Sequence, residues 1–240
     1  MPDRREHRGP HPEDAELFAP AQVPALITAV GDLSWLLTRG YADAAAAKVV
    51  GDRYQLTRRQ RVAVRRCACT DAQRDGRPSS RVPMTSLRGE HVAVDGFNVL
   101  LTIEAALAGG VILGARDGCR RDLASMHGSW KRVAETARAI DLVLDVLAAT
   151  APAAVTFVLD RPVANSGRLA ATIRDAVAIL GLACTVELHD AADRAVLASG
   201  TVVATADSAI LDRAAKWVDL PGPILGRLTP RPWFVDLAGA

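Results

Sequence analysis

Three aspartates stand at the ends of three apolar segments that lie far apart along the chain. Asp95 ends the segment HVAVD, Asp160 ends AVTFVLD, and Asp207 ends TVVATAD. Apolar runs of this length between helical patterns predict parallel strands, whose carboxyl ends share one edge of a sheet. We therefore expect the three carboxylates to converge on one site. Such a cluster repels itself unless a hard divalent cation with oxygen ligands, Mg²⁺ or Mn²⁺, lies within it.

Cations held by carboxylates activate water and stabilise charge on a phosphodiester under attack, so the pattern predicts phosphodiester hydrolysis. A plainer structural reading competes with this one. An aspartate after a strand commonly caps the next helix, and Asp207 directly precedes the helical pattern SAILD. Three such residues in one α/β region favour a shared acidic site.

The elements that must position these carboxylates begin at residue 91, where strand and helix patterns start to alternate. The expected strands cover 91–95, 154–160, 184–189 and 201–207, and the expected helices cover 98–109, 129–149, 165–181 and 208–216. A last short segment, WVDL at 217–220, completes the series. The dipeptide Asp117-Gly118, between two extended runs, predicts a hairpin. This alternation predicts an α/β domain with a mostly parallel sheet covered by helices on both faces.

The first 90 residues divide into three predicted parts. Residues 1–20 are polar and unpatterned, which predicts a mobile tail. Residues 21–70 hold three helical patterns, the last with a capping box at Thr57, and predict a small helical domain. Residues 71–90 contain Gly, Pro and Ser without apolar periodicity, and predict a linker to an α/β domain at 91–240.

Charge is distributed unevenly in this chain of 240 residues, although its net charge is only +2. Ten arginines lie from Arg53 to Arg88 against only Asp71 and Asp75, whereas 14 basic and 16 acidic residues follow from His91 onward. Five of the arginines fall within nine residues of the third helix and predict contact with nucleic-acid phosphates: Arg58, Arg59, Arg61, Arg65 and Arg66. A solvated helix face with some ion pairing is the alternative.

No leader peptide and no apolar run long enough to cross a bilayer is visible, so we expect a cytoplasmic protein without a membrane partner. Four cysteines include a lone Cys67-x-Cys69 without a second pair at zinc-finger spacing, which predicts reduced, mostly buried thiols.

Other polar residues near these segments are candidates for binding substrate, each with an alternative as a helix cap or turn residue. Asn98 follows Asp95, and could equally orient a carboxylate, bind phosphate or cap a helix. The remaining candidates are His127, Ser129, Lys131, Asn165, Ser166, Arg168 and Ser208.

Taken together, VDGFNVL, FVLD and VVATADSAILD resemble the pattern of the PIN-like nuclease superfamily, especially its NYN branch. More closely, the chain resembles an uncharacterised prokaryotic family that joins a small helical domain to a PIN-like domain. The stretches DLSWLLTRGY, VGDRYQLTRRQR, DGFNVLLTIEAAL, HGSWKR, NSGRLA and DSAILDRA carry this likeness, over roughly residues 30–220.

The resemblance implies a PIN-like Rossmannoid three-layer α/β/α fold after a small all-α domain, with Asp95, Asp160 and Asp207 as metal ligands. PIN-like sites often have a further acid on a helix, which is ambiguous here. Asp117 and Asp122 are favoured as additional catalytic acids, whereas Glu104 lies two to three turns down a predicted helix from Asp95.

The leading hypothesis is a metal-dependent endoribonuclease, in which RNA is favoured over DNA by the resemblance alone. A non-catalytic nucleic-acid-binding protein that keeps the fold is the alternative, and a homodimer is left open. A phosphatase of the haloacid dehalogenase type needs a second Asp two residues after the first, where this chain has Phe97. Dinucleotide binding is set aside because no G-x-G-x-x-G follows the first strand.

Overall fold

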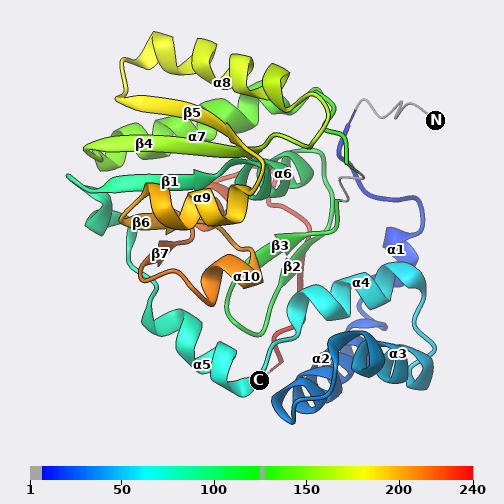
Figure 1. Ribbon diagram of the computed structural model, residues 1–240. Coiled ribbons are helices and arrows are strands. Elements are labelled where there is room, and N and C mark those ends of the chain that lie inside the picture. Colours follow the sequence, from blue (N-terminus) through cyan, green and yellow to red (C-terminus); the bar gives the residue numbers. More distant parts are fainter. Residues whose placement is uncertain (1–6, 125–127, 240) are drawn as a thin grey trace.

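The protein combines an N-terminal group of helices with an α/β unit, as the computed structural model shows (Figure 1). The structure describes residues 7–124 and 128–239. The elements before the sheet are α1 (Asp14–Leu17), α2 (Val23–Thr38), α3 (Asp43–Arg53), α4 (Arg58–Cys67), α5 (Asp71–Ser79) and the 3₁₀ helix η1 (Met84–Leu87). The predicted three-helix group therefore corresponds to α2, α3 and α4.

The main sheet has five parallel strands in the order β5-β4-β1-β6-β7. These strands are β1 (His91–Asp95), β4 (Ala154–Asp160), β5 (Cys184–His189), β6 (Val202–Ala204) and β7 (Trp217–Val218). The predicted α/β class with a mostly parallel sheet is confirmed. Strand β1 is central, and the chain passes from it to β4 on one side and later to β6 on the other, which places a topological switch point at its carboxyl end.

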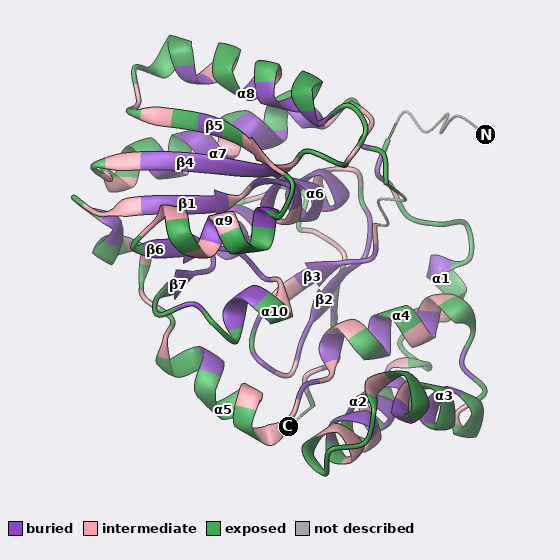
Figure 2. Ribbon diagram, viewed as in Figure 1, coloured by how far each residue is buried: buried purple, intermediate pink, exposed green. Residues whose placement is uncertain are grey.

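Successive residues of each strand point to opposite sides of the sheet, and both sides are apolar. Helices therefore cover both faces. Val92 and Val94 of β1 pack into a large apolar core with α6 (Gly96–Leu107), α7 (Thr136–Thr150) and α8 (Ser166–Leu180). Ala93 packs on the other face with α9 (Ala192–Ser199) and α10 (Ser208–Leu211). Figure 2 shows β1, β4 and β6 mostly buried between these layers, whereas the edge strand β5 is partly exposed.

A second, smaller sheet joins the helical group to the α/β unit. Strands β2 (Ile112–Gly114) and β3 (Arg120–Asp122) form the predicted hairpin, and β8 (Phe234–Asp236) pairs parallel with β2. Leu113 and Val235 lie in one buried cluster with Leu33 of α2. The helical group therefore shares a core with this sheet, which fixes its position beside the α/β unit.

The expected mobile tail over residues 1–20 is wrong for its described part, residues 7–20. Arg8 is buried and forms an ion pair with Glu104 of α6, a side chain with 0% exposure. Phe18 enters the core of the helical group. A polar, unpatterned sequence did not reveal the ion pair of Arg8, because its partner Glu104 lies 96 positions away along the chain.

The expected linker over residues 71–90 is also more structured than predicted. Thr70 and Gln73 form a second capping box that begins α5, and Arg77 of that helix is buried. The helix expected from residue 129 begins at Thr136. Helix α9, strand β8 and the short α11 (Pro221–Leu225) were not predicted.

No helix in the described parts of the chain is long and apolar enough to cross a membrane. Cys67, Cys69 and Cys119 are buried and Cys184 is half-buried, which agrees with the expectation of mostly buried thiols.

Candidate acidic cleft between the helical group and the sheet

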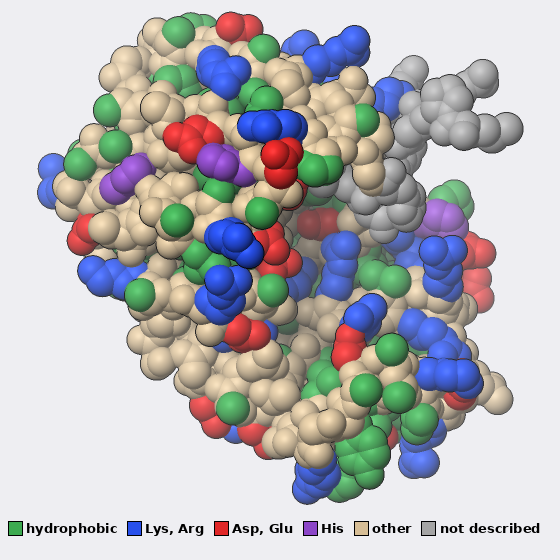
Figure 3. Space-filling model, viewed as in Figure 1, with side chains coloured by type: hydrophobic (Ala, Val, Ile, Leu, Met, Phe, Trp, Pro, Cys, Tyr) green, Lys and Arg blue, Asp and Glu red, His purple; other side chains and the backbone are tan. Residues whose placement is uncertain are grey.

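A cleft of about 580 Å³ lies where the carboxyl ends of the central strands face helix α4. Figure 3 shows the hollow on this face of the molecule, with both acidic and basic side chains around it. On the sheet side it is lined by Asp95, Asp160, Asp193 and Asp207. The opposite side is lined by Arg65 and Arg66 of α4, and Arg121 of β3 also contributes.

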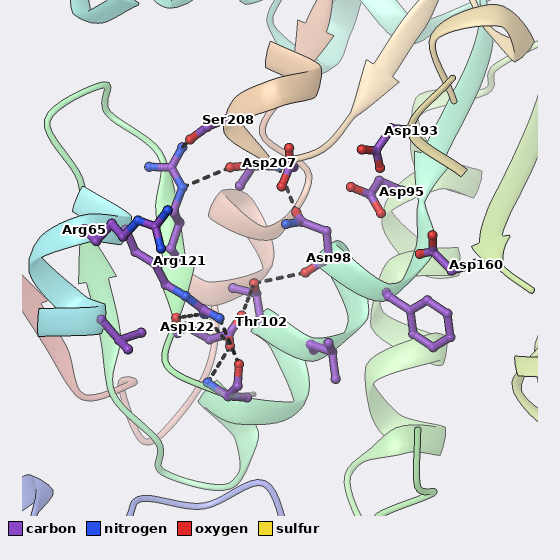
Figure 4. Close-up of a pocket in the computed structure, with 16 residues that line it drawn as sticks. Arg65, Asp95, Asn98, Thr102, Arg121, Asp122, Asp160, Asp193, Asp207 and Ser208 are labelled. Atoms are coloured by element: carbon purple, nitrogen blue, oxygen red, sulfur yellow. Dashed lines mark hydrogen bonds and ion pairs between the residues drawn. The ribbon is translucent and has the colours of Figure 1, made fainter. Parts of the chain in front are cut away.

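The three aspartates predicted from strand ends therefore line the same cleft, as the parallel topology requires. Asp95 ends β1 and Asp160 ends the neighbouring β4, whereas Asp207 follows β6 by three residues. Figure 4 shows their carboxylates, together with that of Asp193, directed into one region. Strand order, and not sequence distance, brings them together.

Asp95 has the most perturbed acid–base behaviour in this group. The pKa of its carboxyl is raised to about 7, chiefly by burial, and the neighbouring charges of Asp207 and Asp160 contribute to this rise. A hydrogen bond from Thr205 Oγ1 to Asp95 Oδ2, at 2.8 Å, opposes this rise. The carboxylate is therefore held in place in surroundings that disfavour its negative charge.

Asp160 is affected in the same direction. Partial burial raises the pKa of its carboxyl, and the charges of Asp193 and Asp207 add to that effect. Mutual repulsion of this kind favours either shared protons or a bound cation. The electrostatics thus agree with one acidic cluster and not with three independent carboxylates.

Asp207 also caps a helix, so the plainer reading of this residue is correct as well. Its Oδ1 accepts hydrogen bonds from the backbone N–H groups of Ala209 and Ile210 at the start of α10. The cap fixes the side chain at the rim of the cleft. Ser208, the next residue, lines the cleft beside it.

Asn98 connects the first strand end to the loop before Asp207. Its Oδ1 accepts a hydrogen bond from the backbone N–H of Ala206 at 2.8 Å. The backbone N–H of Asn98 interacts with the Asp95 carboxylate and lowers its pKa. Among the alternatives for Asn98, the structure supports positioning of the acidic loops.

Asp193 is the acidic residue of the cleft that the sequence prediction missed. It lies in the first turn of α9, four residues after β5 ends at His189. Helix α9 is only eight residues long, and its periodic pattern is too short to predict a helix. The available signal was an acid just after a fourth strand, in HDAAD.

The acids favoured from the sequence as additional catalytic residues occupy other positions. Asp117 is buried outside the cleft lining, where Arg77 and Arg121 bind its carboxylate. Asp122 lines the cleft on the side of α4, and accepts hydrogen bonds from Thr102 Oγ1 at 2.9 Å and the backbone N–H of Ala124 at 2.6 Å. Asp193 is therefore the better candidate for the additional acid.

The described candidates Ser129, Lys131, Asn165, Ser166 and Arg168 are not among the residues that line the cleft. His127 lies outside the described residues. Ser129 forms an isolated bridge with Ala164, and the Lys131 carbonyl accepts a hydrogen bond from Arg8. These contacts give the loop structural roles at the edge of α8.

The polar residues at the start of α8 likewise bind neighbouring backbone. Asn165 donates to the Trp130 carbonyl at 3.0 Å, and Ser166 Oγ donates to the Arg161 carbonyl at 3.3 Å. Arg168 is exposed on the same helix. The structure brings neither these residues nor Lys131 into the acidic cleft.

The arginines of α4 divide into two groups. Arg59 binds the buried Asp14 with an Nη2–Oδ2 distance of 2.7 Å, and Arg61 binds Asp52 with an Nη2–Oδ1 distance of 2.8 Å. Both contacts hold the helical group together and lie outside the cleft lining. Arg58 is exposed and is also outside that lining.

Arg65 and Arg66 form the basic side of the cleft. Arg65 is 61% exposed and pairs with Asp43, with an Nε–Oδ2 distance of 2.8 Å. Arg66 binds Asp122 and donates to the Ala124 carbonyl at 3.1 Å, which fastens α4 to the small sheet. An exposed ion pair such as Arg65–Asp43 contributes little to stability, so the Arg65 guanidinium is available to an anion.

The chemistry of the donors suits a hard divalent cation, since the cluster offers charged oxygen ligands whose mutual repulsion helps to raise the pKa of Asp95 and of Asp160. Within residues 7–124 and 128–239, no three acidic, histidine or cysteine side chains have donors gathered around one point. The carboxylates must therefore turn to share an ion. Asp193 is exposed and can turn freely, whereas Thr205 and the α10 cap hold Asp95 and Asp207.

Comparison with known proteins places both parts of the chain in families without an assigned function. Residues 25–79 match the family described as "Protein of unknown function (DUF434)". An uncharacterized protein of Methanocaldococcus jannaschii is 30% identical over 180 residues, which is 75% of this chain and 86% of that protein. No solved structure matches the chain. Residues 84–223, more than half of the chain, match "Domain of unknown function (DUF5616)", and the protein belongs to that family.

Proposed function

We propose that this protein is a divalent-metal-dependent nuclease with a PIN-like α/β domain, and that RNA is its substrate. The observation that carries the proposal is the convergence of Asp95, Asp160, Asp193 and Asp207 in one cleft whose other side holds Arg65 and Arg66. An acidic cluster beside arginines suits a phosphodiester, because a metal ion and guanidinium groups can share its charge.

Several features of the fold support the PIN-like assignment. The acids lie at or just after the ends of β1, β4 and β6, three adjacent strands of a parallel sheet. Ligands of open α/β sheets bind at this edge, beside the strand at which the strand order changes direction. The preference for RNA rests on the resemblance of the Asp95, Asp160 and Asp207 motifs to the NYN branch.

In this proposal, the four aspartates hold Mg²⁺ or Mn²⁺, and the bound ion supplies water activation and charge neutralisation. Thr205 and the Asn98 backbone fix the Asp95 carboxylate in the orientation the site uses. Arg65 binds the nonbridging oxygens of the nucleic-acid backbone after exchanging its exposed partner Asp43. Arg66 keeps α4 at the correct distance from the sheet.

A non-catalytic nucleic-acid-binding protein is the second candidate. One observation favours it, since the carboxylates in the described chain do not converge on a single point without side-chain rotation. In that case the arginine side of the cleft binds the nucleic acid, and the acids no longer carry out hydrolysis.

The deciding experiment incubates purified protein with end-labelled single-stranded and structured RNAs, and with DNA of the same sequence, in Mn²⁺, Mg²⁺ or chelator. The variants Asp95→Asn and Asp160→Asn are compared with Asp190→Asn, which removes an exposed acid that pairs with Arg161 and does not line the cleft. The proposal predicts metal-dependent cleavage by wild type and Asp190→Asn, and its loss in the two cleft variants. Binding without cleavage supports the second candidate, and cleavage that persists in Asp95→Asn contradicts the mechanism.

A further inference from the structure

A buried charge network lies directly behind the loop that carries Asp207. Arg77 of α5 has only 3% exposure, and its guanidinium binds Asp117 at 2.5 Å and Asp212 at 2.7 Å. Its Nη2 also donates to the Ser208 carbonyl at 3.3 Å. One side chain thus contacts both the hairpin and the helix that Asp207 caps.

Arg121 of β3 extends the network to the residue before Asp207. Its Nη1 and Nη2 bind the two oxygens of Asp117, at 2.8 Å and 2.7 Å, in a bidentate pair. Its Nε donates to the Ala206 carbonyl at 2.9 Å. Figure 4 shows Arg121 beside Ser208 and Asp207 at the edge of the cleft. Asp117 therefore joins the two arginines that hold this loop from behind.

The charges of the network balance internally. Two guanidinium groups face the carboxylates of Asp117 and Asp212, and Asp117 is bound by both arginines. Arg77 reaches Asp117 through Nη1 and Asp212 through Nε, a forked geometry that the single ammonium group of lysine cannot reproduce. Removing either arginine leaves a buried carboxylate with one partner fewer, so the loop has one well-defined arrangement only while both are present.

We propose that Arg77 is a positioning residue for the acidic cleft, which acts through Asp117, Arg121 and Ser208 to hold Asp207. This inference rests on the proposed metal site. Arg77 lies within residues 25–79, which match DUF434. Asp207 lies within residues 84–223, which match DUF5616. The helical region therefore supplies Arg65 and Arg66 on the basic side of the cleft. It also supplies Arg77, which supports the loop of Asp207 on the opposite side.

The matched control is Arg74, one turn earlier on α5. Its ion pairs with Asp71 and Asp75 lie at the surface. Full-length Arg77→Met, Arg77→Lys and Arg74→Met are compared by amide hydrogen exchange without metal. The reporters are the amides of Ala206, which is bound to Asn98, and Leu211, which is bound to the Asp207 carbonyl. Mn²⁺ affinity is then measured by electron paramagnetic resonance, without substrate.

We expect exchange at these two amides to accelerate in Arg77→Met, and Mn²⁺ affinity to fall about tenfold or more, as for other residues that orient metal ligands. Arg77→Lys gives an intermediate effect, and Arg74→Met behaves as wild type. Equal exchange and Mn²⁺ affinity in Arg77→Lys and Arg74→Met contradict the inference, and Arg77→Lys remains informative if Arg77→Met does not fold. If exchange accelerates but wild type binds no Mn²⁺, the proposed metal site fails while the support of the loop by Arg77 stands.

Discussion

Thr205 donates a hydrogen bond to the Asp95 carboxylate across the ends of two neighbouring strands, with an Oγ1–Oδ2 distance of 2.8 Å. The same hydroxyl oxygen accepts a hydrogen bond from the backbone N–H of Asp207 at 3.0 Å. Thr205 has 1% exposure, so water does not replace these contacts. One buried hydroxyl thus connects two acids that are 112 positions apart in the sequence.

Thr205→Val tests this connection. The substitution removes the hydroxyl that favours ionised Asp95, so the pKa of Asp95 should rise above its present value of about 7. Carbon-13 NMR titration of the Asp95 carboxyl measures the change. Thr201→Val is the control, because its hydroxyl binds Glu90 and the His91 carbonyl at the opposite end of the strand. An unchanged Asp95 pKa in Thr205→Val would refute the role given to this hydroxyl.

Asp95 should make the metal-free protein less stable as the pH rises. Its folded pKa of about 7 exceeds the ordinary value of 3.8, so the folded chain holds an extra proton between these limits. The free energy of unfolding therefore falls as the pH increases from about 4 to about 7, by at most about 4 kcal/mol. Asp95→Asn should remove this part of the pH dependence.

Urea unfolding of wild type and Asp95→Asn at pH 5 and pH 8, in chelator, measures the difference. Above pH 7 the variant should be the more stable protein, and Mg²⁺ or Mn²⁺ should stabilise wild type but not the variant. The same pH dependence in both proteins would show that Asp95 does not titrate in this range.

Asp193 should behave as a member of the acidic cluster. Asp193→Asn is expected to weaken Mn²⁺ binding by about tenfold or more, since the substitution removes a charge that faces the other carboxylates. Calorimetric titration with Mn²⁺ measures the affinity. Asp190→Asn removes an acid three residues earlier that pairs with Arg161, and this variant should leave the affinity unchanged. Equal affinities in the two variants would exclude Asp193 from the site.

Strand-end acids were predictable from the sequence because they depend on local patterns. Asp95 and Asp160 each end a clear apolar strand, and parallel pairing then places them at one edge. Asp193 was not predictable in the same way, because its helix is short and the turn after β5 carries no strong signal. The sequence therefore favoured Asp117 and Asp122 as additional acids, which lie in the hairpin region that precedes β4 along the chain.

Long-range ion pairs were the least predictable feature. Asp117 looked like an ordinary hairpin acid, and its partner Arg77 looked like part of a linker. Arg59 and Arg61 were expected to bind phosphate, yet they bind Asp14 and Asp52 within the helical group. Charge counts along the chain show where arginines gather, but the fold decides which of them already have partners.

The N-terminal segment should contribute strongly to stability through Arg8. Because Glu104 is fully buried, Arg8→Met leaves an unpaired carboxylate and should cost about 3–5 kcal/mol. Arg8→Met combined with Glu104→Gln should recover much of this loss, since glutamine keeps the contact with Thr136 and carries no charge. Urea unfolding measures both. A loss below about 1 kcal/mol in the single variant would mean that the pair is not buried in solution.

The most direct test of the acidic cleft as a metal site is anomalous diffraction from crystals of the full chain soaked in Mn²⁺. The account predicts an anomalous peak in direct contact with the carboxylates of Asp95, Asp160, Asp193 and Asp207, and no such peak in Asp95→Asn crystals. No peak in the cleft at saturating Mn²⁺, or one that persists unchanged in Asp95→Asn, would contradict it.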